Sequence, residues 1–285
     1  MRSEYNVGMS VSFDSTWRVI LHAPAPGAWN MAVDEAILEQ VAAGDSPPTL
    51  RLYAWNPPCL SLGRAQPIRD IDLPSLDRLG WSLVRRPTGG RAILHTDELT
   101  YAVIAQTNNP VMSGGVMESY RRISSALLNA LDRLALSARA DQKYEVPDGL
   151  RSDGPVCFEV PSNYEITVGG KKLIGSAQAR RKNGVLQHGT LPLTGDLARI
   201  TQALAYPDVE SRLQAGPRVL RHATTVESVL GRKVTWSETA QAFQDAFLET
   251  FAVSMYRMEL SATEEERVLA LCEEKYSLPL WTVRI

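Results

Sequence analysis

Three alternating segments in the middle of the chain constrain its fold more than any other feature. Residues 163–168, 171–180 and 185–193 alternate apolar and polar side chains, and they are separated by a Gly-Gly pair (169–170) and by Lys-Asn-Gly (182–184). Gly-Gly and Asn-Gly favour tight hairpin turns because these turns need positive φ angles. The region therefore predicts a three-stranded antiparallel meander.

Other segments carry strand and helix patterns without a regular β-α-β alternation. Apolar residues recur at three- and four-residue steps over 30–43 and 116–134, which predicts two helices. Shorter alternating runs predict strands at 50–55, 81–85, 92–95 and 99–106. Hairpins combined with separate helices favour an α+β fold with a mixed, largely antiparallel sheet and flanking helices.

The C-terminal part of the chain, 207–285, is predicted to be mostly helical. Thr235 with Glu238, and Ser261 with Glu264, have the spacing of capping boxes that open helices. Residues 1–15 are polar and aperiodic, so we expect them to be flexible. With 285 residues, 44% of them hydrophobic, the remaining 16–285 are expected to form a single domain.

Composition excludes several classes of protein. A net charge of −2 argues against a dedicated nucleic-acid binder. No apolar run suits a signal peptide or a membrane span, so we expect no membrane partner and a cytoplasmic location. Three scattered cysteines predict neither a disulfide framework nor a zinc site, and no metal site is expected.

A glycine turn between two predicted strands is the first candidate site. Residues 85–91 read Arg-Arg-Pro-Thr-Gly-Gly-Arg and are closely followed by His95. Bare glycine backbone lets a bound group approach closely, and guanidinium groups bind polar or anionic groups. The alternative is a surface hairpin with solvated arginines.

Cys157 and Lys172 form a candidate nucleophile pair. Cys157 lies in a Pro-bracketed irregular segment, whereas Cys59 and Cys272 are expected to be buried and inert. Strand alternation places Lys172 on one face with Ile174 and Ser176, so one of the two adjacent lysines, 171 or 172, points inward. An ammonium near a thiol lowers the thiol pKa.

His95 or His188 offers an alternative partner for Cys157. A histidine base beside a cysteine is typical of a hydrolase. No acidic residue that would orient the imidazole is evident beside either histidine in the sequence, and lone histidines in strands are usually structural.

Taken together, the motifs resemble the lipoate- and octanoate-handling members of the biotin/lipoate protein ligase superfamily. The matching stretches cover roughly 16–285 and are Asn-Met-Ala-Val-Asp-Glu (30–35), Ser-Leu-Gly-Arg-Ala-Gln (61–66), the glycine turn with His95, Lys-Leu-Ile-Gly-Ser-Ala-Gln (172–178) and Gln-His-Gly (187–189). The segment from Pro155 to Glu165 resembles the acyl-thioester cysteine segment of the LipM-type octanoyltransferases.

This resemblance implies a fold related to class II aminoacyl-tRNA synthetase cores, an acyl tunnel and a role in lipoate assembly. Cys157 would take octanoate from octanoyl acyl carrier protein, and a lysine of a lipoyl domain or of glycine cleavage H protein would receive it. Lys172 would favour the thiolate, no cofactor is implied, and Arg85, Arg86 and Arg91 would present a basic surface to these partners. The residues expected to contact substrate are Arg86, Thr88, Gly89, Gly90, His95, Gly175, Ser176, Ala177 and His188.

Two rival functions differ in their chemistry. An ATP-dependent lipoate-protein ligase would form an acyl-adenylate with magnesium and would not need Cys157. A lipoyl-binding module would keep the fold without turnover, but the intact Cys157 and Lys172 argue against it.

Overall fold

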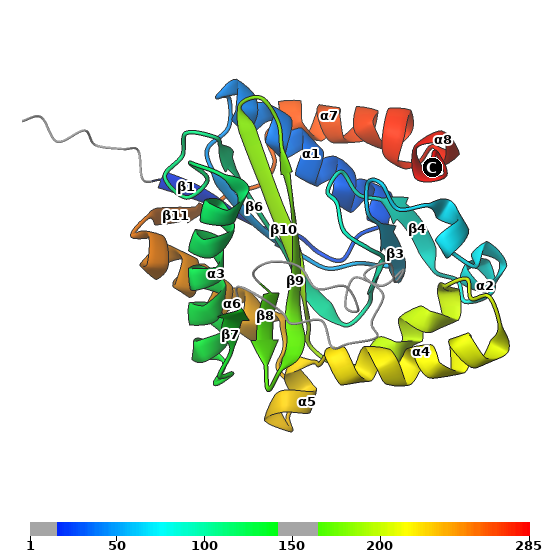
Figure 1. Ribbon diagram of the computed structural model, residues 1–285. Coiled ribbons are helices and arrows are strands. Elements are labelled where there is room, and N and C mark those ends of the chain that lie inside the picture. Colours follow the sequence, from blue (N-terminus) through cyan, green and yellow to red (C-terminus); the bar gives the residue numbers. More distant parts are fainter. Residues whose placement is uncertain (1–15, 142–164) are drawn as a thin grey trace, which may run out of the picture.

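The computed structural model describes residues 16–141 and 165–285 (Figure 1). Within these residues, eight strands form one sheet in the order β11-β1-β2-β6-β10-β9-β8-β7. The pairs β11/β1 and β1/β2 are parallel and the other pairs are antiparallel, so the sheet is mixed and largely antiparallel, as predicted. Its strands are β1 (Thr16–Leu21), β2 (Thr49–Tyr53), β6 (Glu98–Gln106), β7 (Arg139–Asp141), β8 (Glu165–Val168), β9 (Lys171–Arg180), β10 (Gly184–Pro192) and β11 (Ser254–Arg257).

Helices cover both faces of this sheet (Figure 1). On one face, α1 (Gly27–Ala43) and α7 (Ala262–Leu271) pack against residues such as Ile104 and Leu186. On the other face, α3 (Val116–Arg133) and α6 (Trp236–Phe251) enclose a second core with Tyr101 and Val185. The sheet is therefore covered on both sides, and β6 and β10 are buried along nearly their whole length.

A second, three-stranded sheet lies beside the first and has its own small core. Its order is β4-β3-β5, with β3 parallel to β4 and antiparallel to β5. Leu60, Leu62 and Ile93 pack there against Ile200 and Val219. The elements around it are β3 (Cys59–Leu62), η1 (Ile68–Asp70), α2 (Leu73–Arg78), β4 (Ser82–Arg85), β5 (Ile93–His95), η2 (Leu197–Ala203) and α4 (Val209–His222).

The predicted meander is confirmed as β8, β9 and β10, with Gly169 and Gly170 both at positive φ in the first turn. The predicted helices 30–43 and 116–134 are also confirmed, as α1 and α3. Strands β1, β3, β7 and β11 were not predicted. Strands β1, β3 and β11 form parallel pairs with strands distant in the sequence, and such pairs leave no hairpin-turn signal between them, whereas β7 has only three residues and is too short to show an alternating pattern.

The C-terminal part contains the predicted helices. Ser261 and Glu264 form a complete capping box at α7, while Thr235 caps α6 only through its own hydroxyl, which accepts a hydrogen bond from Glu238 N at 3.1 Å. A π-helical segment, η3 (Cys272–Tyr276), and α8 (Pro279–Thr282) follow α7, and α5 (Val226–Leu230) precedes α6. In the described parts of the chain, we find no helix with the length and apolar character needed to cross a membrane.

Candidate functional site

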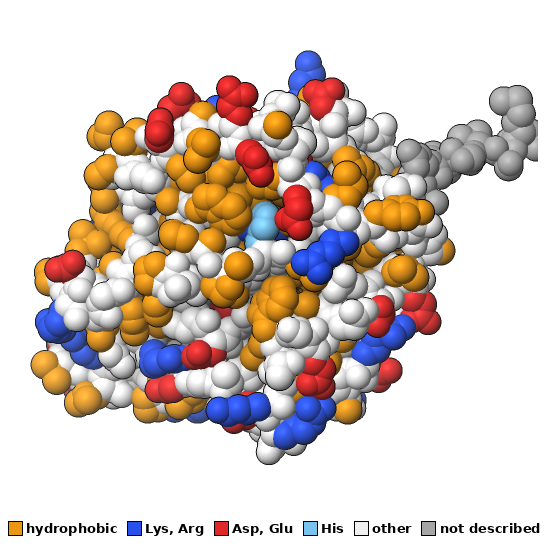
Figure 2. Space-filling model, turned by 180° about the vertical axis from the view of Figure 1, so that it is seen from behind, with side chains coloured by type: hydrophobic (Ala, Val, Ile, Leu, Met, Phe, Trp, Pro, Cys, Tyr) orange, Lys and Arg blue, Asp and Glu red, His pale blue; other side chains and the backbone are white. Residues whose placement is uncertain are grey.

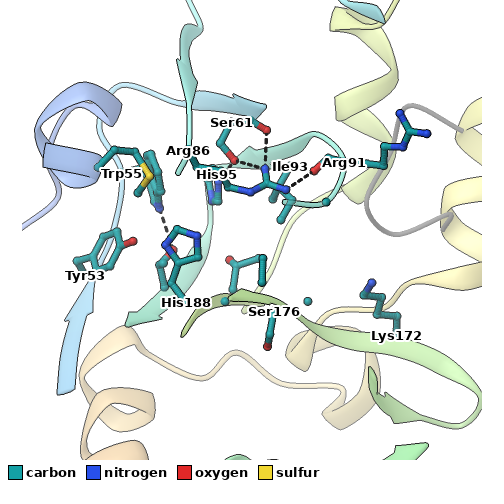
Figure 3. A pocket seen from close by; sticks show the side chains of 17 residues that line it. Tyr53, Trp55, Ser61, Arg86, Arg91, Ile93, His95, Lys172, Ser176 and His188 are labelled. Carbon is teal, nitrogen blue, oxygen red and sulfur yellow. Dashed lines mark hydrogen bonds between the residues drawn. The ribbon is translucent and has the colours of Figure 1, made fainter. Parts of the chain in front are cut away.

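A pocket of about 640 Å³, its open mouth included, lies between the two sheets (Figure 3). Eight of the predicted site residues line it: Arg86, Gly90, His95, Lys172, Gly175, Ser176, Ala177 and His188. Tyr53 and Trp55 lie on one side of the view in Figure 3, while Arg91 and Lys172 lie on the other. The pocket therefore has an aromatic end and a basic end.

A β-bulge turns Lys172 toward this pocket. The register of β8 and β9 shifts between Ile166 and Thr167, because Ile166 pairs with Ile174 but Thr167 pairs with Lys172. Leu173 is the extra residue, and such an insertion interrupts the alternation of faces. Ile174 packs in the core with α3 and α6, so the expectation that Lys172 and Ile174 share a face is wrong.

Ser176 was expected to share that face with Lys172, and its side chain also lies elsewhere. Its Oγ forms a 2.6 Å hydrogen bond with the Tyr101 hydroxyl, on the side of the core with α3 and α6. Figure 3 shows the Ser176 side chain directed away from the pocket. Ser176 thus borders the pocket through its backbone.

Lys172 is buried and paired with a carboxylate that sequence reasoning did not single out. Its Nζ donates a hydrogen bond to Glu165 Oε1 at 2.6 Å, and the side chains are 3% and 4% exposed. Lys171, its neighbour, is exposed and donates to the Leu220 carbonyl at 2.7 Å. This result confirms that one of the two lysines points inward.

Arg85 and Arg86 of the glycine turn are buried and donate hydrogen bonds to backbone carbonyls near the pocket. The Arg86 guanidinium donates to Ser61 O at 3.0 Å, to Gly89 O at 2.8 Å and to Arg91 O at 2.7 Å. Arg85 is fully buried and donates to Gly63 O and Thr282 O. The expected basic surface of Arg85, Arg86 and Arg91 is therefore wrong for the first two, since their hydrogen bonds to backbone carbonyls keep them buried.

His95 belongs to a buried hydrogen-bonded chain on one wall. Its Nδ1 lies 2.6 Å from Glu98 Oε1, and its Nε2 lies 2.7 Å from Ser61 Oγ. The Thr100 hydroxyl donates to the same Glu98 oxygen, and the Trp55 ring stacks on the imidazole with centroids 3.9 Å apart. Glu98 is thus the acidic orienter that the sequence did not reveal.

His188 has an equally well-defined environment. Its Nδ1 lies 3.0 Å from Asp34 Oδ2, and its Nε2 lies 2.7 Å from Thr88 Oγ1. Burial lowers the pKa of His188, although Asp34 counteracts this effect. The imidazole is then neutral, with its proton on Nδ1 facing the carboxylate and Thr88 donating to Nε2.

Asp34 anchors this histidine to a buried arginine. Burial raises the Asp34 pKa, but the Arg51 guanidinium and the His188 hydrogen bond outweigh it, and the pKa falls below its ordinary value. Arg51 Nη1 lies 2.7 Å from Asp34 Oδ1, and both side chains are 0% exposed. The expectation that neither histidine has an acidic orienter is therefore wrong for His188 as well as His95. The second ring nitrogen of His95 contacts Ser61 and that of His188 contacts Thr88, whereas Cys157 lies outside the described residues, so the hydrolase alternative stays a prediction.

The Arg51 network also reaches a second hollow in the described part of the molecule. Arg51 Nε donates to His22 Nδ1 at 2.8 Å, and burial, reinforced by the Arg51 charge, lowers the pKa of His22 to about 3. His22 lines a surface hollow with Trp29, Leu260 and Val268. Figure 2 shows the molecule from behind, with hydrophobic side chains around a histidine and charges of both signs interspersed.

Of the two remaining predicted contacts, Thr88 is buried and Gly89 is exposed. Thr88 is buried against His188, and the Gly89 carbonyl accepts hydrogen bonds from Arg86. Both residues hold the glycine turn in place and are absent from the pocket lining. The lining also includes Ser61 of the 61–66 motif, together with apolar or β-branched residues that the sequence did not distinguish from ordinary core: Met31, Tyr53, Trp55, Ile93, Thr100 and Thr190.

Gly63 allows the glycine turn to approach β3. A Cβ at position 63 would lie 1.8 Å from the Gly90 carbonyl oxygen, whereas a Cβ at Gly89 would meet nothing within 4 Å. Gly63→Ala is expected to displace the turn and destabilise the fold by about 1–3 kcal/mol, a typical cost of overpacking. Urea unfolding measures this loss, with Gly89→Ala as the stability control. Equal urea midpoints for Gly63→Ala and Gly89→Ala would show that the glycine turn accommodates the added methyl group without loss of stability.

The cysteines differ in their accessibility. Cys157 lies outside the described residues, so its role stays a prediction. Burial raises the pKa of Cys59 to about 12, and burial followed by the charge of Glu273 raises that of Cys272. Cys59 is fully buried and Cys272 is partly buried, and both thiols are protonated at neutral pH. Within the described residues, no cluster of three His, Cys, Asp or Glu side chains is arranged to hold a metal ion.

A pocket with an aromatic end and a basic end suits a small molecule with an apolar tail and a polar head. The sequence model of the lipoyl protein ligase A/B catalytic domain matches residues 26–248, and the chain belongs to this family. This finding confirms the predicted superfamily.

Individual relatives match over nearly the full length of the chain. It is 39% identical over 272 residues to octanoyltransferase LipM of Carboxydothermus hydrogenoformans, covering 94% of this chain and 99% of that protein. It is 37% identical over 277 residues to octanoyltransferase LipM of Symbiobacterium thermophilum, covering 95% and 99%.

Solved structures show the same fold. A bipartite lipoate protein ligase of Thermoplasma acidophilum superposes with a TM-score of 0.79 at 24% identity, covering 93% of this chain and 95% of that one. A lipoate-protein ligase A bound with ATP superposes with a TM-score of 0.76 at 25% identity, covering 93% and 98%.

Proposed function

We propose that this chain is an octanoyltransferase of lipoate biosynthesis. The observation that carries the proposal is the 39% identity over 94% of the chain to a relative of that activity. The proposed donor is octanoyl acyl carrier protein, and the proposed acceptor is a lysine of a lipoyl domain or of glycine cleavage H protein. The pocket supports this function, because it offers an apolar enclosure that ends at a buried cation.

In the proposed mode of binding, the octanoyl chain lies along the apolar lining of Met31, Tyr53, Trp55 and Ile93. Burial of each CH₂ contributes about 0.8 kcal/mol, so an enclosure of fixed length selects for chain length. The thioester carbonyl then lies toward the basic end with Lys172. Backbone N–H groups of the glycine turn and of Gly175 and Ser176 are the proposed donors to the carbonyl oxygen.

The proposed reaction has two acyl-transfer steps. The Cys157 thiolate attacks the donor thioester carbonyl, the carrier thiolate leaves and takes a proton from solvent, and an octanoyl thioester forms on Cys157. The unprotonated acceptor lysine then attacks this thioester. The amine nitrogen loses a proton to solvent, the Cys157 thiolate leaves, and the product is an octanoyl amide. The Lys172 ammonium stabilises the thiolate before the first step and after the second.

Transfer is expected to need neither ATP nor magnesium, because the thioester donor arrives already activated. Octanoyl acyl carrier protein and an H protein, incubated with this chain in EDTA without nucleotide, should give octanoylated acceptor. Intact-mass measurement should also show an octanoyl adduct on the enzyme when acceptor is omitted.

Free octanoate under the same conditions serves as the control and should give no product. If transfer occurs only with ATP, magnesium and a free acid, the chain is an ATP-dependent lipoate-protein ligase, whose fold it shares.

A further inference from the structure

The aromatic end of the pocket is closed by buried side chains. Met31, Tyr53 and Trp55 are 1%, 0% and 5% exposed, whereas the Arg91 side chain is 29% exposed. Figure 3 places Tyr53 and Trp55 on the side of the pocket opposite Arg91. An apolar chain whose head group stays at the basic end therefore points its tail toward Trp55.

The indole of Trp55 is held at two points. Its Nε1 donates a hydrogen bond to Thr100 Oγ1 at 2.8 Å, and its ring stacks on the imidazole of His95, with centroids 3.9 Å apart and planes 11° from parallel. The backbone of Trp55 is held separately, by a bridge to Ala25. Thr100 and His95 therefore fix the orientation of the side chain rather than the path of the backbone.

Both contacts of the indole lead to one oxygen of Glu98. The Thr100 hydroxyl donates to Glu98 Oε1 at 2.6 Å, and His95 Nδ1 lies 2.6 Å from the same oxygen. Glu98 is 6% exposed and is not among the residues that line the pocket. A carboxylate accepts hydrogen bonds more strongly than a neutral oxygen does, and it polarises the Thr100 hydroxyl, which strengthens the bond from Trp55.

Ser61 holds the imidazole of His95 on its other side. His95 Nε2 lies 2.7 Å from Ser61 Oγ, and Arg86 Nη1 donates to the same oxygen at 3.1 Å. With the Nδ1 proton facing Glu98, the Ser61 hydroxyl donates to Nε2. The ring on which Trp55 stacks is thus fixed at both nitrogens.

We infer that Glu98 is a positioning residue that sets the length of the acyl chain which the pocket accepts. It acts through Thr100 and His95, which hold Trp55 at the closed end. In this role it touches neither the acyl chain nor a reacting atom, and it takes part in no step of the transfer. The inference rests on the proposed function, because it takes the ligand to be a saturated acyl group.

Calorimetric titration with hexanoate, octanoate and decanoate measures the length preference without any transfer step. The parent protein should bind octanoate more tightly than the other two acids, because decanoate does not fit against a fixed indole. Glu98→Gln removes a charge and Thr100→Val removes a hydroxyl, each with little change of shape. In both variants the ratio of decanoate to octanoate affinity should rise by about tenfold, since each newly buried CH₂ contributes a factor of about four.

Three further variants make the test specific. Thr100→Ser retains the hydroxyl and should keep the ratio of the parent. Asp97→Asn removes the charge of the neighbouring carboxylate, which is exposed and pairs with Arg199, so it is the matched control for Glu98→Gln and should also keep that ratio. In a Trp55→Phe background, which lacks the indole N–H, Thr100→Val should change the ratio no further.

An equal loss of affinity for all three acids in Glu98→Gln and Thr100→Val would indicate a structural role only and would overturn the inference. An unchanged ratio, or an equal rise in the Trp55→Phe background, overturns it too, and so does a parent that binds none of the acids or prefers decanoate. If Glu98→Gln does not fold, Glu98→Asp, whose carboxylate is one CH₂ shorter, replaces it with the same expected rise.

Transfer of octanoate to an H protein separates the two proposals. A parent protein that selects octanoate in the titration but transfers no octanoyl group refutes the proposed function alone. Transfer by the parent, combined with an unchanged ratio in the variants, refutes only the role of Glu98.

Discussion

Cys157→Ser is expected to abolish octanoyl transfer while the protein still folds. A serine hydroxyl is a far weaker nucleophile than a thiolate at neutral pH, and its octanoyl ester reacts more slowly with an amine. Loss of a covalent nucleophile costs a hydrolase on the order of 10⁶ in kcat. We therefore expect no detectable acceptor octanoylation and no hydroxylamine-sensitive label on the variant.

Cys59→Ser and Cys272→Ser are the matched controls and should keep transfer activity. Burial raises the pKa of both thiols, so neither supplies a thiolate at neutral pH. Thermal unfolding of all three variants checks that they are folded. Label that persists in Cys157→Ser would assign the nucleophile to another residue.

Among the substitutions proposed for this chain, Asp34→Asn is expected to lower the free energy of unfolding the most. The substitution leaves the fully buried Arg51 without its carboxylate, and breaking a buried ion pair costs about 3–5 kcal/mol. It also removes the charge that orients His188, so the wall behind the glycine turn loses a fixed contact. Urea unfolding at pH 7 measures the loss.

The cost should shrink on acidification, because the folded pKa of Asp34 lies below its ordinary value. A depressed carboxyl pKa stabilises the folded protein above the unfolded pKa of about 3.9, and this contribution is lost as the pH falls through the folded value. Asp45→Asn, at an exposed position after α1, serves as the control and should stay within about 0.5 kcal/mol. Equal stability of the two variants at pH 7 would show that the Asp34–Arg51 pair contributes nothing net.

Much of the fold was predictable because its signals are local. The hairpin turns of β8, β9 and β10 and the apolar stripe of α3 each lie within a few residues of the structure they specify. The resemblance of the separated motifs also predicted that the glycine turn, Lys172 and His188 meet in one site, and they line one pocket.

The partners of the site residues were decided by the tertiary structure. Asp34 meets His188 across 154 positions of sequence, because α1 packs on the face of the sheet to which β10 contributes that histidine. Glu98 is only three residues from His95, but regular strand alternation would separate their faces. A two-residue bend between β5 and β6 brings the two side chains together.

The sequence by itself determined the meander, the main helices and the inward lysine, because periodicity and turn residues involve positions close together in the chain. It also determined the family, because the matching motifs occur in a fixed order along the chain. Only the tertiary structure decided that Arg85 and Arg86 are buried and that Lys172 is paired with Glu165. The two arginines donate hydrogen bonds to the carbonyls of Ser61, Gly63 and Thr282, and the bulge at Leu173 turns Lys172 toward the pocket. A charged side chain can be buried only where a counter-ion or a carbonyl oxygen lies beside it. Segments far away in the sequence supply these groups, so the sequence near the charged residue does not reveal them.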